Sequence, residues 1–136
     1  MTTAKYERIN AVRAEHYKDD DACSVIAIAI ACNVSFGKAQ AAMRRAGRKD
    51  SHGATLSAMR DAITELGFMC KSWDTSTRPT VAQFKKYVEG AVLVVTKGHV
   101  SCVLDGIVHD YIGQSSRKRV HSFINVTPYV EKGETV

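Results

Sequence analysis

The sequence has little of what marks membrane, secreted or repetitive proteins. Its longest apolar run is far shorter than the roughly 20 residues of a transmembrane helix. Residues 1–10 are polar and lack the basic-then-apolar order of a secretory signal. There is no low-complexity tract and no internal repeat. These absences predict a soluble, cytoplasmic protein that does not associate with a membrane.

Cysteine is present, but its spacing does not fit zinc binding or disulfide frameworks. No Cys-x-x-Cys pair occurs, and the spacing is not compact. We therefore expect free thiols in a reducing compartment and no metal site. The four cysteines are Cys23, Cys32, Cys70 and Cys102.

Length and composition are those of one ordinary globular domain. The chain has 136 residues, of which 45% are hydrophobic and 24% charged. A domain commonly has about 100–150 residues. We therefore expect a single domain over residues 1–136, whose oligomeric state the sequence leaves open.

The net charge of +5 is concentrated in three short clusters. Such clusters bind nucleic acid or acidic partners in some proteins and are solvated surface in others. No aromatic residues interleave with them, so there is no stacking platform for single strands. Nucleic-acid binding is therefore a secondary hypothesis. The clusters are Arg44, Arg45, Arg48 and Lys49; Lys85 and Lys86; and Arg117, Lys118 and Arg119.

Apolar periodicity predicts helices in the first two thirds of the chain. The helix over residues 23–33 is almost entirely apolar, so we expect it at the centre of the fold, with Lys18–Asp21 supplying its loop and N-cap. The first basic cluster then has a simpler explanation, because cations complement the C-terminal dipole of a helix ending at Gly47. The predicted helices cover about residues 4–15, 23–33, 36–46, 56–66 and 80–89.

The last third has the alternation and the Val and Ile content of strands. We predict strands over residues 91–97, 99–104, 107–112 and 119–126, and an extended segment over residues 68–73. Helices followed by an antiparallel sheet make an α+β fold.

Asp105-Gly106 lies between two apolar strands and predicts a two-residue hairpin turn. This turn places Cys102 opposite His109 and Ser101 opposite Asp110. Because faces alternate along a strand, Asp110 and His99 share a face, one diagonal step apart. The carboxylate can therefore orient the imidazole of His99, whereas His109 points to the other face.

Cys23 opens the apolar helix, where unpaired N–H groups and the helix dipole favour a thiolate. An imidazole beside it, such as that of His99, activates the thiol and later protonates the leaving group. An acid such as Asp110 then fixes the ring. Gly98 fits a backbone that approaches another chain or a ligand closely. We therefore take Cys23, His99 and Asp110 as candidate catalytic residues.

In order and spacing, residues 20–29, residues 98–100 and Asp110 resemble the motifs of papain-like cysteine peptidases. Within that family they are most similar to the bacteriocin-processing peptidases and to small phage-encoded relatives. The resemblance implies a papain-like fold with a cysteine-bearing helix packed on an antiparallel sheet. It also implies hydrolysis or transfer at an amide or thioester of a peptide or protein substrate, without a cofactor, in the host cytoplasm for a phage-encoded member.

The resemblance also points to an oxyanion-hole candidate. Members of that family usually carry a glutamine about six residues before the nucleophile, and its amide donates a hydrogen bond to the oxyanion. That position is Tyr17 here. Its hydroxyl and the backbone N–H of Cys23 are therefore the candidate donors. The ionised side chains of Asp19–Asp21 cannot donate, and their charge opposes thiolate formation.

Two alternatives stay open. In the first, Cys23 is a small buried hydrophobe and His99 a core histidine satisfied by Asp110; the chain is then a papain-like scaffold that binds a host protein or nucleic acid. In the second, the triad is active, but the sequence does not choose among peptidase, isopeptidase, amidase, transglutaminase-like and acetyltransferase chemistry. Three further histidines, His16, His52 and His121, are predicted to be surface or structural residues.

Overall fold

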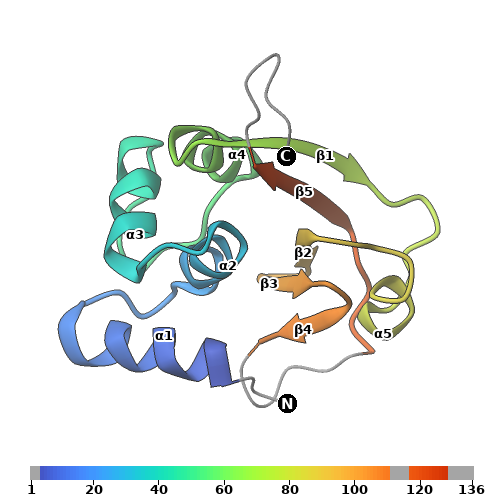
Figure 1. Cartoon of the computed structure of the whole chain (residues 1–136), viewed down its shortest axis with the longest axis horizontal. Helices are drawn as coiled ribbons and strands as arrows, with labels where there is room; N and C mark the ends of the chain where they lie inside the picture. Colours follow the sequence, from blue (N-terminus) through green and yellow to red (C-terminus); the bar gives the residue numbers. More distant parts are fainter. Residues whose placement is uncertain (1–3, 111–116, 129–136) are drawn as a thin grey trace.

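The computed structural model describes residues 4–110 and 117–128, with helices α1 to α4 first and then the strands, among which the short helix α5 follows β1 (Figure 1). The α+β prediction is confirmed. The elements are α1 (Ala4–His16), α2 (Cys23–Cys32), α3 (Phe36–Arg45), α4 (Leu56–Glu65), β1 (Phe68–Asp74), α5 (Val81–Phe84), β2 (Ala91–Thr96), β3 (His99–Leu104), β4 (Ile107–His109) and β5 (Ser122–Pro128).

The strands form one antiparallel sheet in the order β1-β5-β2-β3-β4. β1 is the segment that the sequence predicts to be extended, and it forms one edge of the sheet. β5 comes last in the chain but lies between β1 and β2 (Figure 1). β5 therefore joins β1 on one side to the β2-β3-β4 meander on the other.

Helix α2 is the centre of the larger hydrophobic cluster. It packs against β3 and β2 and also contacts α1, α3 and α4, and Figure 1 shows it between the other helices and the sheet. Its side chains are buried from Ser24 to Ile30, and Cys32 is buried as well. A helix that is apolar on all sides needs such an environment, so its predicted central position is confirmed.

A smaller cluster occupies the other face of the sheet. Val81 and Phe84 of α5 pack there against Val92 and Val94 of β2. Leu93 lies between these two valines and belongs to the larger cluster instead. This is the alternation expected of a strand that is covered on both faces.

Three predicted elements differ from the structure by more than one residue at a boundary, and one of them, the strand predicted over residues 119–126, is β5, Ser122–Pro128. The capping box of Thr80 and Gln83 is present, but α5 ends at Phe84 rather than at Glu89. Val81 and Phe84 are its buried residues, whereas Tyr87 is 84% exposed, so Tyr87 does not pack on the core as part of a further turn. The strand predicted over residues 107–112 ends at 109, and its last two positions lie outside the described residues.

Within the described parts of the chain, no single helix is long and apolar enough to cross a membrane. Helices α2 and α3 reach the required length and hydropathy only together, as a pair bent by 114°.

Candidate active site

The hairpin of β3 and β4 brings His99 to Asp110. Its turn residues Asp105 and Gly106 have φ angles of 49° and 81°, as a two-residue hairpin turn with two positive φ values requires. The predicted pairing of Cys102 with His109 is confirmed. The ladder stops there, and Asp110 follows as the next residue.

His99 and Asp110 form a close, buried pair. His99 Nε2 lies 2.7 Å from Asp110 Oδ1 and 2.9 Å from Oδ2. The exposed fractions of the two residues are 8% and 7%. Burial lowers the pKa of His99, but hydrogen bonds with Asp110 and with the side chain of Cys23 outweigh it and raise this pKa to about 9. The imidazole is therefore held in its protonated form at neutral pH.

Cys23 completes the group from the other side of the imidazole ring. It is the first residue of α2 and is half-buried, and its side chain is hydrogen-bonded to His99. Because Asp110 occupies Nε2, the ring nitrogen left for the thiol is Nδ1. The structure thus brings together Cys23, His99 and Asp110, which lie far apart in the sequence.

Gly98 has a conformational role rather than the predicted role in close backbone approach. Its φ is +70°, whereas a Cβ built on it would meet nothing within 4 Å. Lys97 and Gly98 form the turn between β2 and β3, and Thr96 pairs with His99 across it. Glycine is favoured here because the left-handed backbone disfavours other residues, and this turn places His99 at the start of β3.

Tyr17 lies against α3. Its ring packs on Phe36 with the centroids 4.9 Å apart. Its hydroxyl lies over Gly37, where a built Cβ would come within 2.2 Å of the oxygen. Tyr17 is also not among the described residues that line the two cavities at Cys23. The oxyanion-hole role predicted for Tyr17 therefore finds no support in its position.

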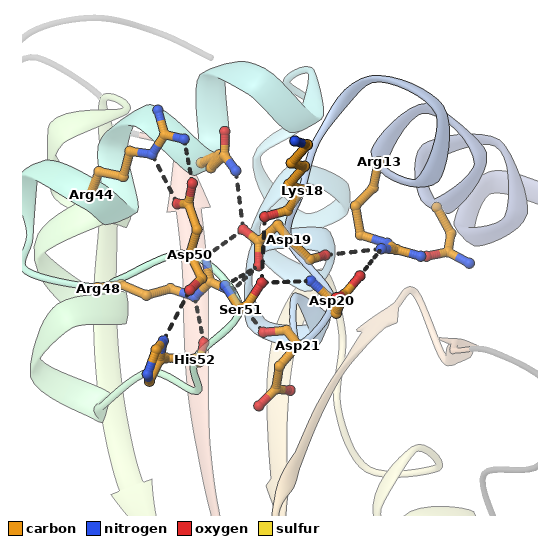
Figure 2. Close-up of polar contacts among 12 residues, drawn as sticks. Arg13, Lys18, Asp19, Asp20, Asp21, Arg44, Arg48, Asp50, Ser51 and His52 are labelled. Atoms are coloured by element: carbon orange, nitrogen blue, oxygen red, sulfur yellow. Dashed lines mark hydrogen bonds and ion pairs between the residues drawn. The ribbon is translucent and has the colours of Figure 1, made fainter.

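Asp19 is the centre of a buried polar network just before Cys23 (Figure 2). Arg48 donates to its carboxylate from Nη1 at 2.8 Å and from Nη2 at 2.7 Å. Gln40 Nε2 donates at 3.1 Å and the backbone N–H of Ser51 at 2.7 Å. The side chains of Arg48 and Asp19 are both 0% exposed. The network therefore joins the segment before α2 to the loop after α3.

The same network also holds the backbone that leads into α2. Arg48 Nη2 donates to the carbonyl of Asp21 at 2.7 Å, and Arg48 Nε donates to the carbonyl of His52 at 2.9 Å. Arg13 Nη1 reaches the carbonyl of Asp19 at 2.9 Å from α1. Helices α1 and α3 and the loop after α3 thus contribute to fixing the entry to α2, because Gln40 belongs to α3.

The aspartates before Cys23 differ from their predicted roles. The N-cap of α2 is Ala22, and no side chain caps this helix, so the prediction of an aspartate N-cap is wrong. Asp19 is instead engaged with Arg48. Burial raises the pKa of Asp19, but hydrogen bonds, chiefly from Arg48, lower it to about 2. Asp19 is therefore ionised, and the guanidinium compensates its charge.

Sequence analysis missed this network because it assigned Arg48 to the end of the preceding helix. One signal was available. In α3, Phe36, Ala39 and Met43 are buried at helical spacing, and the buried Gln40 follows Ala39 on the same stripe. A glutamine on an apolar stripe needs a polar partner inside the protein.

The first basic cluster is largely compensated by carboxylates. This is the cluster that sequence analysis considered for nucleic-acid binding, and carboxylates on neighbouring segments occupy most of its donors. Three of its four cations form ion pairs: Arg44 with Asp50, Arg45 with Glu65, and Arg48 with Asp19.

The remaining thiols and histidines have different surroundings. Burial raises the pKa of Cys32 and that of Cys102 to about 12, which disfavours both thiolates. Burial and then Lys5 lower the pKa of His109. His16, His52 and His121 are exposed, as predicted for surface residues.

Two cavities meet at Cys23 and His99. The polar cavity, of about 340 Å³, lies between α1 and the β2–β3 turn. Its polar side chains are Asn10, Arg13, Asp20, Asp21 and Lys118. The apolar cavity, of about 310 Å³, lies toward α4, and its apolar side chains are Ala54, Leu56, Met59, Val95 and Val100. A molecule bound in either cavity is next to the thiol.

The described residues contain no group of three or more His, Cys, Asp or Glu side chains that could hold a metal ion. Comparison of the chain with protein-family models, curated proteins and solved structures finds no match.

Proposed function

We propose that this chain is a cysteine-dependent hydrolase with a papain-like fold, acting on an amide or isopeptide bond of a peptide or protein. The observation that carries the proposal is the position of His99. One ring nitrogen is bound by Asp110 at 2.7 Å, and the side chain of Cys23 meets the ring as its other partner. A purely structural histidine would be satisfied by Asp110 alone and would not also need a half-buried thiol that borders two cavities.

In the proposed reaction, Cys23 Sγ attacks the carbonyl carbon and the C–N bond then breaks. The imidazolium of His99 gives its proton to the leaving amine. Water next attacks the thioester carbon and His99 takes a proton from it. The C–S bond then breaks, and the carboxylic acid leaves with the Cys23 thiolate and the His99 imidazolium restored. Asp110 keeps the ring oriented and stabilises the imidazolium throughout. Atoms and protons balance over the cycle.

The first turn of α2 is our candidate for binding the oxyanion. The backbone N–H groups of Cys23 and Ser24 lie before the first intrahelical bond, which Ile26 makes to the carbonyl of Ala22. No side chain caps this end of α2. N–H groups at a helix start favour negative charge, and this proposal replaces the hydroxyl of Tyr17.

The test is the pH dependence of iodoacetamide labelling, with mass spectrometry to locate the modified cysteine. Cys70 is the matched reference, because it is half-buried like Cys23. We expect Cys23 to be labelled selectively and well below pH 8, and to lose this advantage in His99→Ala and His99→Gln. Labelling of Cys23 no faster than that of Cys70 in the wild type, and unchanged in both variants, would refute the proposal.

The binding-scaffold hypothesis predicts a different result. Cys23→Ala removes the nucleophile but keeps a small apolar side chain at the start of α2. In a hydrolase this variant loses all turnover, whereas a scaffold keeps its partner binding. A Cys23→Ala variant with full biological effect would favour the scaffold.

A further inference from the structure

The apolar cavity beside Cys23 contains one side chain that its surroundings do not explain. Ser24 follows the nucleophile and is among the lining residues. It is 2% exposed, and its hydroxyl has no hydrogen-bond partner within the described part of the chain. A buried hydroxyl without a partner destabilises the folded protein, so we looked for what this one could bind.

The position of Ser24 in α2 explains why its hydroxyl stays unpaired. A helical serine commonly bonds back to the carbonyl four residues earlier. For Ser24 that residue is Asp20, which precedes the helix. The cavity is also lined by apolar side chains, among them Met59, Val95 and Val100, and by the polar Asp21, Thr96 and His99, none of which bonds to this hydroxyl. The hydroxyl therefore has an unused hydrogen-bonding capacity in the residue that follows Cys23 in the wall of the cavity.

We propose that this cavity binds an apolar side chain of the substrate, and that Ser24 Oγ hydrogen-bonds a polar group of the substrate beside that side chain. The inference rests on the proposed function, because the cavity is a specificity site only if Cys23 reacts. Its volume of about 310 Å³ is at the lower end of the roughly 300–1,000 Å³ of ligand pockets. It therefore suits one side chain rather than a large ligand.

The polar cavity cannot serve the same purpose. Its lining includes Arg13, Asp20 and Lys118, which the apolar cavity lacks, and an apolar group there would strip water from charges without replacing it. The two cavities therefore give the substrate a direction across Cys23, with an apolar side chain toward α4 and a polar segment toward α1.

N-substituted chloroacetamides test this directly. Cys23 Sγ displaces chloride from the methylene carbon, a C–S bond forms, and a proton is released. The substituent on nitrogen is isobutyl, methyl or 2-carboxyethyl, and each rate is divided by that of the same reagent with glutathione. We expect the isobutyl reagent to label Cys23 about tenfold faster than the other two, because a few buried methylenes have this effect.

Two variants identify the site. Ala54→Phe places a ring in the cavity and should remove the preference for isobutyl, whereas Ala14→Phe on the exposed side of α1 should keep it. Ser24→Ala should raise the melting temperature, because it removes an unpaired hydroxyl. It should also slow the isobutyl reagent severalfold relative to the methyl reagent.

Three results would overturn the inference. The first is equal normalised rates for the three substituents, and the second is an isobutyl preference that survives Ala54→Phe. The third is a lower melting temperature of Ser24→Ala, which would mean that the hydroxyl already has a partner. In each case, fast iodoacetamide labelling of Cys23 that depends on His99 would leave the hydrolase proposal standing. A slow, His99-independent reaction would refute both.

Discussion

The charge on the imidazole of His99 determines the electrostatics of this site. Burial acts against its charge, yet its pKa is raised to about 9 by Asp110 and by Cys23. A cation that persists at neutral pH stabilises a neighbouring thiolate, which is the reactive form of a cysteine. The two carboxylate contacts at 2.7 and 2.9 Å are therefore central to the reactivity of Cys23.

Asp110→Asn tests this electrostatic role. The amide keeps the shape of the side chain but loses its charge, so we expect the pKa of His99 to fall well below about 9. Cys23 should then be alkylated about tenfold or more slowly at neutral pH, as one unit of pKa on a coupled group corresponds to about tenfold. NMR titration of the imidazole and the labelling rate measure the two effects.

Asp105→Asn is the matched control for that experiment. It makes the same chemical change in the turn of the same hairpin, where Asp105 Oδ1 accepts a hydrogen bond from the N–H of Gly90. It should leave both the titration of His99 and the labelling of Cys23 unchanged. Equal effects of the two substitutions would contradict a specific role of Asp110.

Gly98 lets the position of His99 be tested through the backbone alone. Gly98→Ala puts a Cβ where φ is +70° and nothing lies within 4 Å. The whole cost is therefore conformational, about 1–2 kcal/mol of unfolding free energy. Gly53→Ala is the control, because Gly53 also has open space but no left-handed φ. Chemical denaturation measures both, and an equal loss in both variants would contradict this explanation.

At the residue scale, the sequence predicts those contacts that follow from a local signal such as a turn. Asp105-Gly106 determines a register, and the register predicted that Asp110 reaches His99. The surroundings of Ser24 and Asp19 do not follow from such a signal. The missing partner of Ser24 depends on which residues surround the start of α2, and Asp19 meets Arg48 only because two loops 29 residues apart in the sequence come together.

At the element scale, the start of α2 is fixed from outside the helix. No side chain caps it, and the backbone before it is bound by Arg48 and Arg13 instead. The side chain that holds this segment is fully buried, so its position is set by the packing of α3 and the following loop. Placement of Cys23 thus depends on the Asp19–Arg48 pair.

Arg48→Met should therefore be one of the most destabilising substitutions away from the apolar core. It leaves the carboxylate of Asp19 buried without its cation, and breaking a buried pair on one side costs about 3–5 kcal/mol. Arg45→Met removes an exposed pair with Glu65 and should cost far less. Urea denaturation gives both free energies.

The double variant Asp19→Leu, Arg48→Met completes the cycle. Replacing both charges by apolar groups removes the uncompensated carboxylate, so it should recover part of the loss seen in Arg48→Met. The single variant Asp19→Leu is measured as well. If the double variant loses as much free energy of unfolding as the two single variants together, the pair is not coupled. Labelling of Cys23 in each variant reports whether the thiol keeps its position.

Elements themselves were predictable where their pattern is strong. The start of α2 and the start of α5, with its capping box at Thr80, were predicted from the sequence, because apolar periodicity and capping residues are local signals. The end of α5 was not, because a helical pattern through Glu89 does not reveal that Tyr87 is left exposed.

At the scale of the whole molecule, the candidate site lies where the two layers meet. The helical layer supplies Cys23, the sheet supplies His99, and Asp110 directly follows the edge strand β4. Sequence predicted the strands but not their order. The insertion of β5 between β1 and β2 depends on contacts between segments far apart in the chain, for which no local residue pattern exists.

The two titrating groups that are tied most closely into the fold give its stability a defined pH dependence. Asp19 has its pKa lowered from 3.8 to about 2, so its contribution is present above about pH 4 and is lost as the pH falls through 2. His99 has its pKa raised from 6.5 to about 9. Its contribution is therefore complete below about pH 6.5 and is lost as the pH rises through 9.

We therefore expect the melting temperature to be highest between about pH 4 and 6.5 and to fall on both sides. Asp19→Asn should flatten the acid side and His99→Gln the alkaline side up to pH 9. Above pH 9 the buried thiols Cys32 and Cys102 add a further loss, because their pKa values are raised to about 12 in the folded protein. A wild-type melting temperature that rises from pH 6.5 to 9 would mean that His99 is not held protonated by Asp110, and the electrostatic basis of the proposed thiolate would fail with it.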